Sequence, residues 1–304
     1  MKSNILKISK PADYDTWVGK HSDHDMITVI EYERVSPVRY SLNQYEVYGL
    51  FLQGDDAKVD LKYGSGKYDY SDGTLICVAP GQLGGKEDDG TAVNMTGWAV
   101  IFHPDLLQGT ALEKEIHNFS FFDYRINEAL HMSAEERDIL INLFRQIEKE
   151  LKFPPDELQN RIIVGFLNLI LRYAQRFYNR QFKTRALANN DICARFDELL
   201  KNYFDSDAQQ THGLPTVKYC AEQLCLSPNY LNDVIKRTTG NTANSIIKNI
   251  IIRLAKNRLV AGMNSSEVAY SLGYEYPQHF ARTFKKLTGE TPTEYCRRRL
   301  TSNS

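Results

Sequence analysis

Two segments near the C-terminal end of this 304-residue chain begin and end with the same residue types. Pro228 and Pro277 each begin a segment, and Gly240 and Gly289 each end one, so that the segments lie 49 residues apart. Pro is favoured at the first helical position because its missing N–H would have no partner there, and Gly ends a helix by adopting a positive φ. A short amphipathic segment and a tight turn precede each of them. The repeat therefore predicts two helix-turn-helix units, a motif whose second helix enters the major groove of DNA.

The charges of the chain are divided unevenly. Residues 210–304 contain 13 Lys and Arg against 6 Asp and Glu, whereas residues 1–209 contain 24 and 32. The net charge of −1 therefore hides a C-terminal third of +7 on a body of −8. Because phosphate neutralisation supplies most of the non-specific affinity of proteins for nucleic acid, this division predicts a polyanionic partner for the C-terminal third.

Between the two units, residues 242–260 have the pattern of one long helix. Apolar residues recur every three or four positions from Ala243 to Ala255, while Lys248, Arg253 and Lys256 fall on other positions. At 1.5 Å per residue such a helix is roughly 27 Å long, and successive major grooves on one face of DNA lie about 34 Å apart. The helix is therefore long enough to hold two recognition helices one DNA turn apart.

The N-terminal part changes from a strand pattern to a helix pattern. Residues 26–108 contain β-branched and aromatic runs separated by Gly and Asp turns, which predict short strands of a barrel or sandwich. These strands are expected at 27–32, 45–52, 59–63, 75–78 and 98–102. Residues 133–182 then have helical periodicity, with a capping box at Ser133 and Glu136. The aromatic residues of the strand region form either a core or the lining of a pocket: Tyr32, Tyr40, Tyr45, Tyr48, Phe51, Tyr63, Trp98 and Phe102.

The five cysteines are odd in number and scattered, which predicts reduced thiols, with Cys220 and Cys225 buried in the first helical unit. No apolar run in the sequence approaches the about 20 residues that cross a bilayer, and the N-terminus lacks a signal-peptide core. We therefore expect a cytoplasmic protein with no membrane partner.

Many residues of the two units fall on a known family pattern. The second unit carries Glu267, Val268, Ala269, Gly273, Tyr274, His279, Phe280, Arg282, Phe284, Lys285, Lys286, Gly289, Thr291, Pro292, Tyr295, Cys296 and Arg297. The first unit carries Ala221, Leu224, Ser227, Pro228, Tyr230, Leu231, Lys236, Gly240 and Thr242. This pattern resembles the DNA-binding domain of the AraC-type (AraC/XylS family) bacterial transcription regulators over residues 216–298. Two positions depart from it, because Asp233 stands where the family usually carries Arg, and Ile235 where it usually has Phe.

The N-terminal part is similar to the cupin-type effector domain of the same family, in Phe51-Leu52, Asp72-Gly73-Thr74-Leu75, Ala79-Pro80-Gly81-Gln82 and Val100-Ile101-Phe102. The resemblance implies an α+β chain with a cupin-like β-barrel in 1–132 and two dimerisation helices in 133–185. It implies an all-α DNA-binding domain in 186–304, in which helix-turn-helix units at 216–240 and 264–289 are joined by the long helix at 242–260.

By carry-over of family positions, base contacts are expected from Asn229, Asn232, Asp233, Gln278, His279 and Arg282. Asn and Gln can pair with adenine and Arg with guanine, whereas a carboxylate such as that of Asp233 can accept only from cytosine N4. Phosphate contacts are expected from Lys236, Arg237, Lys285 and Lys286.

The resemblance implies a transcriptional regulator that binds double-stranded DNA, forms a homodimer, activates transcription and contacts RNA polymerase. Two interpretations of the barrel stay open: a sensor for a small-molecule effector, or a platform for dimerisation and transcription contacts. The alternative function is a cupin-type metal enzyme fused to a nucleic-acid-binding domain. We expect no enzyme, no metal and no cofactor, because His103, His117 and His131 are far apart in the sequence and cupin metal sites use closely spaced His residues.

Overall fold

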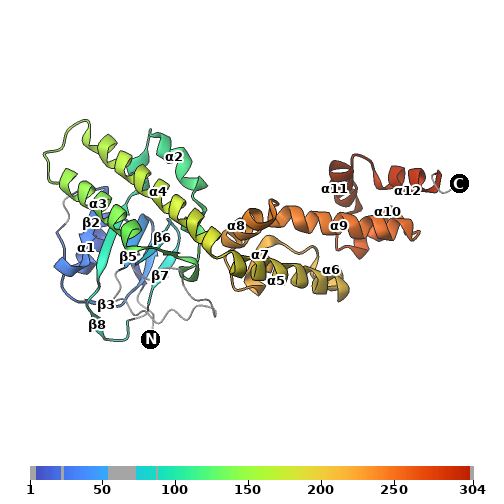
Figure 1. Cartoon of the computed structure of the whole chain (residues 1–304), viewed down its shortest axis with the longest axis horizontal. Coiled ribbons are helices and arrows are strands. Elements are labelled where there is room, and N and C mark those ends of the chain that lie inside the picture. Colours follow the sequence, from blue (N-terminus) through green and yellow to red (C-terminus); the bar gives the residue numbers. More distant parts are fainter. Residues whose placement is uncertain (1–4, 22–23, 54–72, 87, 302–304) are drawn as a thin grey trace. The chain divides into compact units, whose positions relative to one another are not determined.

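The computed structural model describes residues 5–21, 24–53, 73–86 and 88–301 (Figure 1). The chain divides into two compact units, residues 1–185 and 186–304. The first unit contains sheets and helices and the second is all-helical, so the chain is α+β as predicted. In the described part of the chain, each helix is too short or too polar to cross a lipid bilayer.

The described strands of the first unit form three sheets. The largest sheet is antiparallel, with the order β10-β6-β5-β9-β2, a second sheet contains β1, β4 and β7, and β3 pairs with β8. The strands are β1 (Ile5–Ile8), β2 (Ile27–Glu31), β3 (Val38–Arg39), β4 (Leu42–Tyr45), β5 (Tyr48–Gln53), β6 (Thr74–Val78), β7 (Leu83–Gly85), β8 (Ala92–Val93), β9 (Gly97–Phe102) and β10 (Leu130–His131). The helices are α1 (Pro11–Val18), α2 (Ala111–Glu115), α3 (Ala134–Glu150) and α4 (Gln159–Thr184). The expected strand at 59–63 lies outside the described residues.

The described strands do not close into the expected barrel. One edge of the large sheet, β10, is covered by the Gln181 side chain of α4 instead of a further strand. The Gln181 Nε2 group donates to Ala129 O (3.2 Å), and Gln181 Oε1 accepts from the His131 N–H (2.8 Å). These two backbone groups point to the same side of the strand, where a neighbouring strand would bond. The buried amide, only 2% exposed, thus ends the sheet.

Both faces of the large sheet are buried, which explains the continuous apolar run of β9. On one face, Tyr32, Tyr45 and Phe51 pack in a core with Tyr14 of α1. On the other face, which α3 and α4 cover (Figure 1), the Tyr48 ring stacks on Phe102 and meets Phe122 edge-on. The buried members of the aromatic set that the sequence offers as a pocket lining are therefore divided between two cores, whereas Tyr40 is only half-buried, with Lys86 Nζ over its ring. Tyr63, one of that set, lies outside the described residues.

The second unit has one core shared by all of its long helices. Its helices are α5 (Ala186–Asp205), α6 (Ala208–His212), α7 (Val217–Gln223), α8 (Pro228–Thr239), α9 (Ala243–Val260), α10 (Ser265–Ser271), α11 (Pro277–Thr288) and α12 (Pro292–Thr301). The core joins the two helix-turn-helix units through α9, whose residues Ile247, Ile251, Ala255 and Leu259 are buried in it.

The two helix-turn-helix turns are closed in the same way. Cys225 (φ 59°) and Gly273 (φ 88°) occupy the left-handed position of each turn. The N–H of the following residue then donates to the carbonyl oxygen five residues earlier, at 2.8 Å in the first turn and 3.0 Å in the second. These positions lie 48 residues apart, whereas Pro228 and Pro277 lie 49 apart, because the second turn has one additional residue.

Cys225 is exposed, so the prediction that it is buried was wrong, and Cys220 is buried as predicted.

We predict that substitution at Gly273 destabilises the protein, whereas substitution at Cys225 leaves its stability almost unchanged. In Gly273→Ala the new Cβ would lie 2.5 Å from Gln209 O and 3.0 Å from Gly213 C, both backbone atoms. The variant should lose about 2 to 4 kcal/mol of unfolding free energy through backbone strain and overpacking. Cys225→Gly should stay within about 1 kcal/mol of the wild type, because relief of left-handed strain offsets the larger entropy of Gly in the unfolded chain. Urea unfolding of both variants measures this difference, and equal losses would contradict it.

Candidate nucleic-acid interface

The two recognition helices are anchored by one face and exposed on the other. In α8 the residues Tyr230, Leu231, Val234 and Ile235 are buried, and in α11 Phe280 and Phe284 are buried. Phe284 stands 49 residues after Ile235, so the departure from the family pattern exchanges one buried apolar side chain for another. The opposite side of each helix is left for contact with a partner.

Local capping sets where α8 begins and ends. The Ser227 hydroxyl oxygen accepts from the Tyr230 N–H (3.2 Å) at the start. At the end, Gly240 adopts φ 76° and its N–H donates to Lys236 O (2.9 Å). The α11 helix ends in the same way at Gly289, but its N-cap residue forms no side-chain capping bond. The two recognition helices therefore share the same C-terminal glycine cap, whereas their N-terminal caps differ.

The predicted DNA-contacting residues lie on two helices with different exposure. In the second unit Gln278, His279, Arg282, Lys285 and Lys286 are all exposed. In the first unit Lys236 and Arg237 are exposed, whereas Asn229, Asn232 and Asp233 are half-buried. Basic residues therefore occupy the last turn of both recognition helices, where they also complement the negative end of the helix dipole.

The side chain of Asn232 is bonded within the domain. Its Oδ1 accepts from the backbone N–H of Ala243, the first residue of α9, at 3.2 Å. This bond links the middle of the first recognition helix to the start of the connecting helix. The amide oxygen predicted to read a base is therefore engaged in the structure.

A residue outside the predicted set holds the second unit in place. Gln209 of α6 is 0% exposed, and its Nε2 group donates to Ser271 O (3.2 Å) at the last residue of α10. The Ser271 hydroxyl in turn accepts from Arg258 Nη1 of α9 (2.7 Å). The polar sequence around Gln209 gave no signal for this role, because polar residues in short connections are usually solvated.

The metal-enzyme alternative finds no support among the described residues. No group of three or more His, Cys, Asp and Glu side chains in that part of the chain is arranged to hold a metal ion. The Cys220 thiol is buried and Cys225 is exposed, and burial raises the pKa of Cys220 to about 11. A protonated thiol is a poor metal ligand, because the thiolate is the form that binds.

Comparison with known proteins is consistent with this geometry. A family model described as a helix-turn-helix domain matches residues 220–298. The HTH-type transcriptional regulator AdiY of Escherichia coli is 38% identical over 93 residues, which cover 30% of this chain and 35% of AdiY. The uncharacterized HTH-type transcriptional regulator YijO of Escherichia coli is 27% identical over 154 residues, half of each chain. The chain thus spans half or less of the length of these curated relatives.

Among solved structures, apo ToxT from Vibrio cholerae aligns over 91% of this chain and 98% of its own, at 11% identity and a TM-score of 0.28. The family match and the curated relatives identify residues 220–298 as a helix-turn-helix domain of the AraC type.

Proposed function

We propose that this protein is a sequence-specific DNA-binding transcriptional regulator. The observation that carries the proposal is the pair of recognition helices, each exposed on one side and both held in the single core built around the 18-residue helix α9. A helix of that length spans roughly 27 Å, which suits two insertions into major grooves about 34 Å apart. The excess of 7 basic charges in residues 210–304 supplies attraction to phosphate. The cytoplasm is the proposed location, because the DNA partner is there.

Within this proposal, base readout falls to Asn229, Asp233, Gln278, His279 and Arg282, and Lys236, Arg237, Lys285 and Lys286 contact phosphates. The activating role and the contact with RNA polymerase belong to the same proposal and rest on the family resemblance. No catalytic step is part of it.

Selection of bound sequences from a random pool of duplex DNA tests the function directly. The full-length protein should enrich a site with two conserved blocks whose centres lie about 10 base pairs apart, one helical turn. Binding that weakens with salt but enriches no sequence would contradict sequence-specific regulation, since phosphate contacts alone are sequence-independent.

Arg282 offers the sharpest test of readout. Arg282 is exposed on α11, and a bidentate Arg–guanine pair contributes ~1 to 3 kcal/mol of discrimination. We predict that Arg282→Ala relaxes base preference at one position of the selected site, measured by competition among single-base variants. The matched control is Lys286→Ala, which should weaken binding to all variants equally. Uniform weakening by both changes would assign Arg282 to phosphate.

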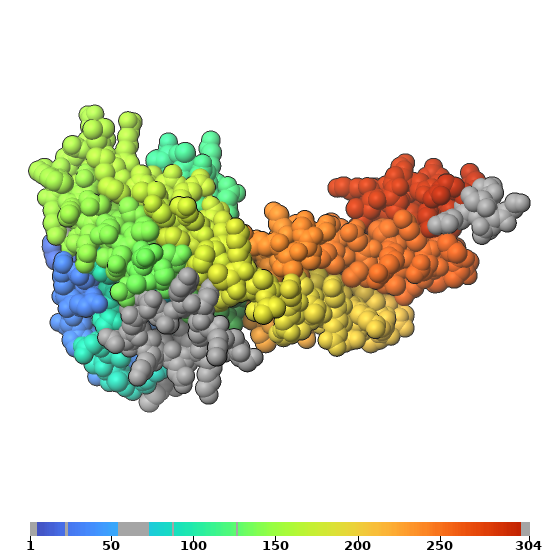
Figure 2. Space-filling view, viewed as in Figure 1, coloured from blue at the N-terminus to red at the C-terminus, as the bar shows by residue number. Residues whose placement is uncertain are grey.

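We further propose that the first unit forms a homodimer through the face built by α3 and α4, which is exposed in Figure 2. On α3 the exposed residues Glu135, Asp138, Asn142, Gln146 and Lys149 follow helical spacing along one side. The start of this line is acidic and its end is basic. A second copy running antiparallel, with a two-fold axis at Asn142, would place each Glu135 opposite Lys149 of the partner.

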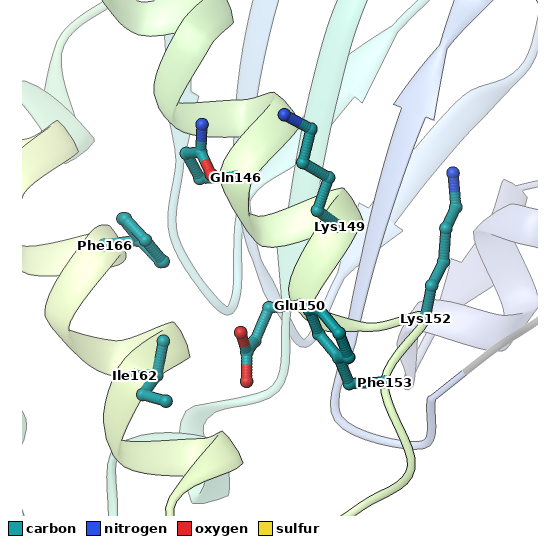
Figure 3. Close-up of a pocket in the computed structure, with 7 residues that line it drawn as sticks. All are labelled: Gln146, Lys149, Glu150, Lys152, Phe153, Ile162 and Phe166. Atoms are coloured by element: carbon teal, nitrogen blue, oxygen red, sulfur yellow. The ribbon is translucent and has the colours of Figure 1, made fainter.

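Apolar surface beside this line supports the same arrangement. Ile162 and Leu169 of α4 are 41% and 43% exposed. Ile162 lines a groove of about 400 Å³ between α3 and α4 (Figure 3), together with Gln146, Lys149, Glu150, Lys152, Phe153 and Phe166. Gly165 of α4 costs ~1 kcal/mol relative to Ala in a helix interior, yet a Cβ there would meet no described atom within 4 Å. Close approach of a partner helix would explain a glycine at that position.

A charge exchange tests the register of this dimer. Glu135→Lys and Lys149→Glu should each place two pairs of like charges across the interface. Each single variant should therefore weaken the dimer in sedimentation measurements. The double variant should restore it, although both helix ends then carry charges that oppose the helix dipole. A double variant as weak as either single variant would reject the pairing of Glu135 with Lys149.

A small-molecule effector bound by the first unit is a second candidate function. The observation in its favour is a set of buried tyrosine hydroxyls in the core beside α1. Tyr14 and Tyr32 are bonded to each other (2.7 Å), and Tyr45 accepts from Asn43 Nδ2 (3.2 Å). Polar groups in an apolar interior are typical of ligand sites.

A thermal-shift screen of the full-length protein tests this candidate. A ligand at 100 times its dissociation constant stabilises by ~2.7 kcal/mol, and a screen without any shift would favour the platform role.

A further inference from the structure

The turns that leave the two recognition helices repeat the same threonine hydrogen bonds. The single O–H of Thr239 has two acceptors within reach, the carbonyl oxygen four residues earlier (2.8 Å from Oγ1) and the one two residues later (3.3 Å). Thr288, 49 residues further on, has the same two acceptors at 2.8 Å and 3.0 Å. The helix that follows is then capped by Thr242 in the first repeat and by Thr291 in the second, each accepting from the N–H three residues later at 3.2 Å.

The two turns differ in the first residue of the helix that follows. It is Ala243 in the first repeat and Pro292 in the second. Ala243 is 0% exposed, so its N–H is out of reach of bulk water, and it donates to Asn232 Oδ1. Pro292 has no N–H, and Ala281 stands where Asn232 stands in the first repeat. Donor and acceptor are therefore both present in one repeat and both absent in the other.

This matched change has a simple physical cause. The first N–H groups of a helix have no partner within the helix, and a buried one must be bonded by another group. Proline at the first position solves the problem by removing the donor. The first repeat solves it with an amide side chain from the preceding helix, which also ties the two helices together.

We infer that Asn232 is a positioning residue that fixes the angle between α8 and α9, and that it does not read an adenine. Recognition of adenine by Asn needs both halves of the amide, because the oxygen accepts from N6 while the NH₂ group donates to N7. The Asn232 oxygen is already bonded to Ala243. Readout in the first unit then falls to Asn229 and Asp233, which lie on the same helix. This inference rests on the proposed function, in which α8 enters the major groove.

The test uses the full-length protein and the DNA that the wild type selects. We expect Asn232→Ala to weaken binding by roughly 5- to 30-fold, the factor that corresponds to one or two kcal/mol. The loss should be the same for every single-base variant of the site, so that the preference profile is unchanged. Asn229→Ala is the matched control on the same helix, and it should alter the preference at one position.

The rescue variant copies the second repeat into the first. Asn232→Ala combined with Ala243→Pro removes donor and acceptor together and should recover most of the lost affinity and melting temperature. Thr242, the residue before position 243, has the extended backbone that a following proline requires. Asn232→Asp gives a second arm in case proline is not tolerated, because it keeps the oxygen and lacks the NH₂ group. Its preference profile should equal that of the wild type.

Several results would overturn the inference. A changed base preference in Asn232→Ala or Asn232→Asp would assign base reading to this side chain. A lower melting temperature with unchanged affinity of the folded Asn232→Ala protein would reduce its role to stability alone. A wild-type protein that selects no DNA sequence overturns both the proposed function and this inference. The melting temperature of the double variant, measured without DNA, tests the Asn232–Ala243 bond independently of the proposed function.

Discussion

The burial of α9 is the constraint on which the rest of the C-terminal unit depends. A helix-turn-helix unit of some 25 residues is too small to bury a core of its own. The buried residues of α9, among them Ile247, Ile251 and Leu259, supply the missing apolar surface to both units, and α9 packs against α8, α10 and α12. The helix α8 contacts α9 directly, whereas α11 packs on α10 and α12, which in turn contact α9. The spacing of the two recognition helices is therefore set by one core built around α9.

Local chemistry explains which parts of this unit could be predicted from the sequence. The starts of α8 and α11 at Pro228 and Pro277, and their ends at Gly240 and Gly289, depend on residues within one turn of each boundary. The roles of Asn232 and Gln209 could not be predicted, because their partners lie 11 and 62 residues away and belong to other helices. A residue-type pattern carries no information about which of several polar surfaces a side chain will meet.

The same distinction applies to the first unit. The strands β2, β6 and β9 follow from apolar runs, because a run of β-branched and aromatic residues between turn residues fits a buried strand. The edge of the sheet cannot be predicted from apolar runs, because it depends on the side-chain amide of Gln181. This residue lies on a helix, 50 residues along the chain from the strand that it covers. Among the described residues the expected barrel is an open sheet, and at its β10 edge a helix side chain forms the hydrogen bonds that a neighbouring strand would form.

The two recognition helices share their framework and differ in the chemistry that they present. Asp233 and Arg282 occupy the same position in the repeat, 49 residues apart. A carboxylate can accept from cytosine N4 and repels phosphate, whereas a guanidinium donates to guanine and attracts phosphate. Both helices end in two basic residues, so in the proposed complex it is this one position that gives the second unit more of the electrostatic attraction. The first unit depends more on correct placement of α8, since its central position offers no cation. The bond between Asn232 and Ala243, which fixes α8 to α9, therefore belongs to the unit with the weaker electrostatic attraction to DNA. We expect the position of α8 to matter most for DNA affinity in that first unit.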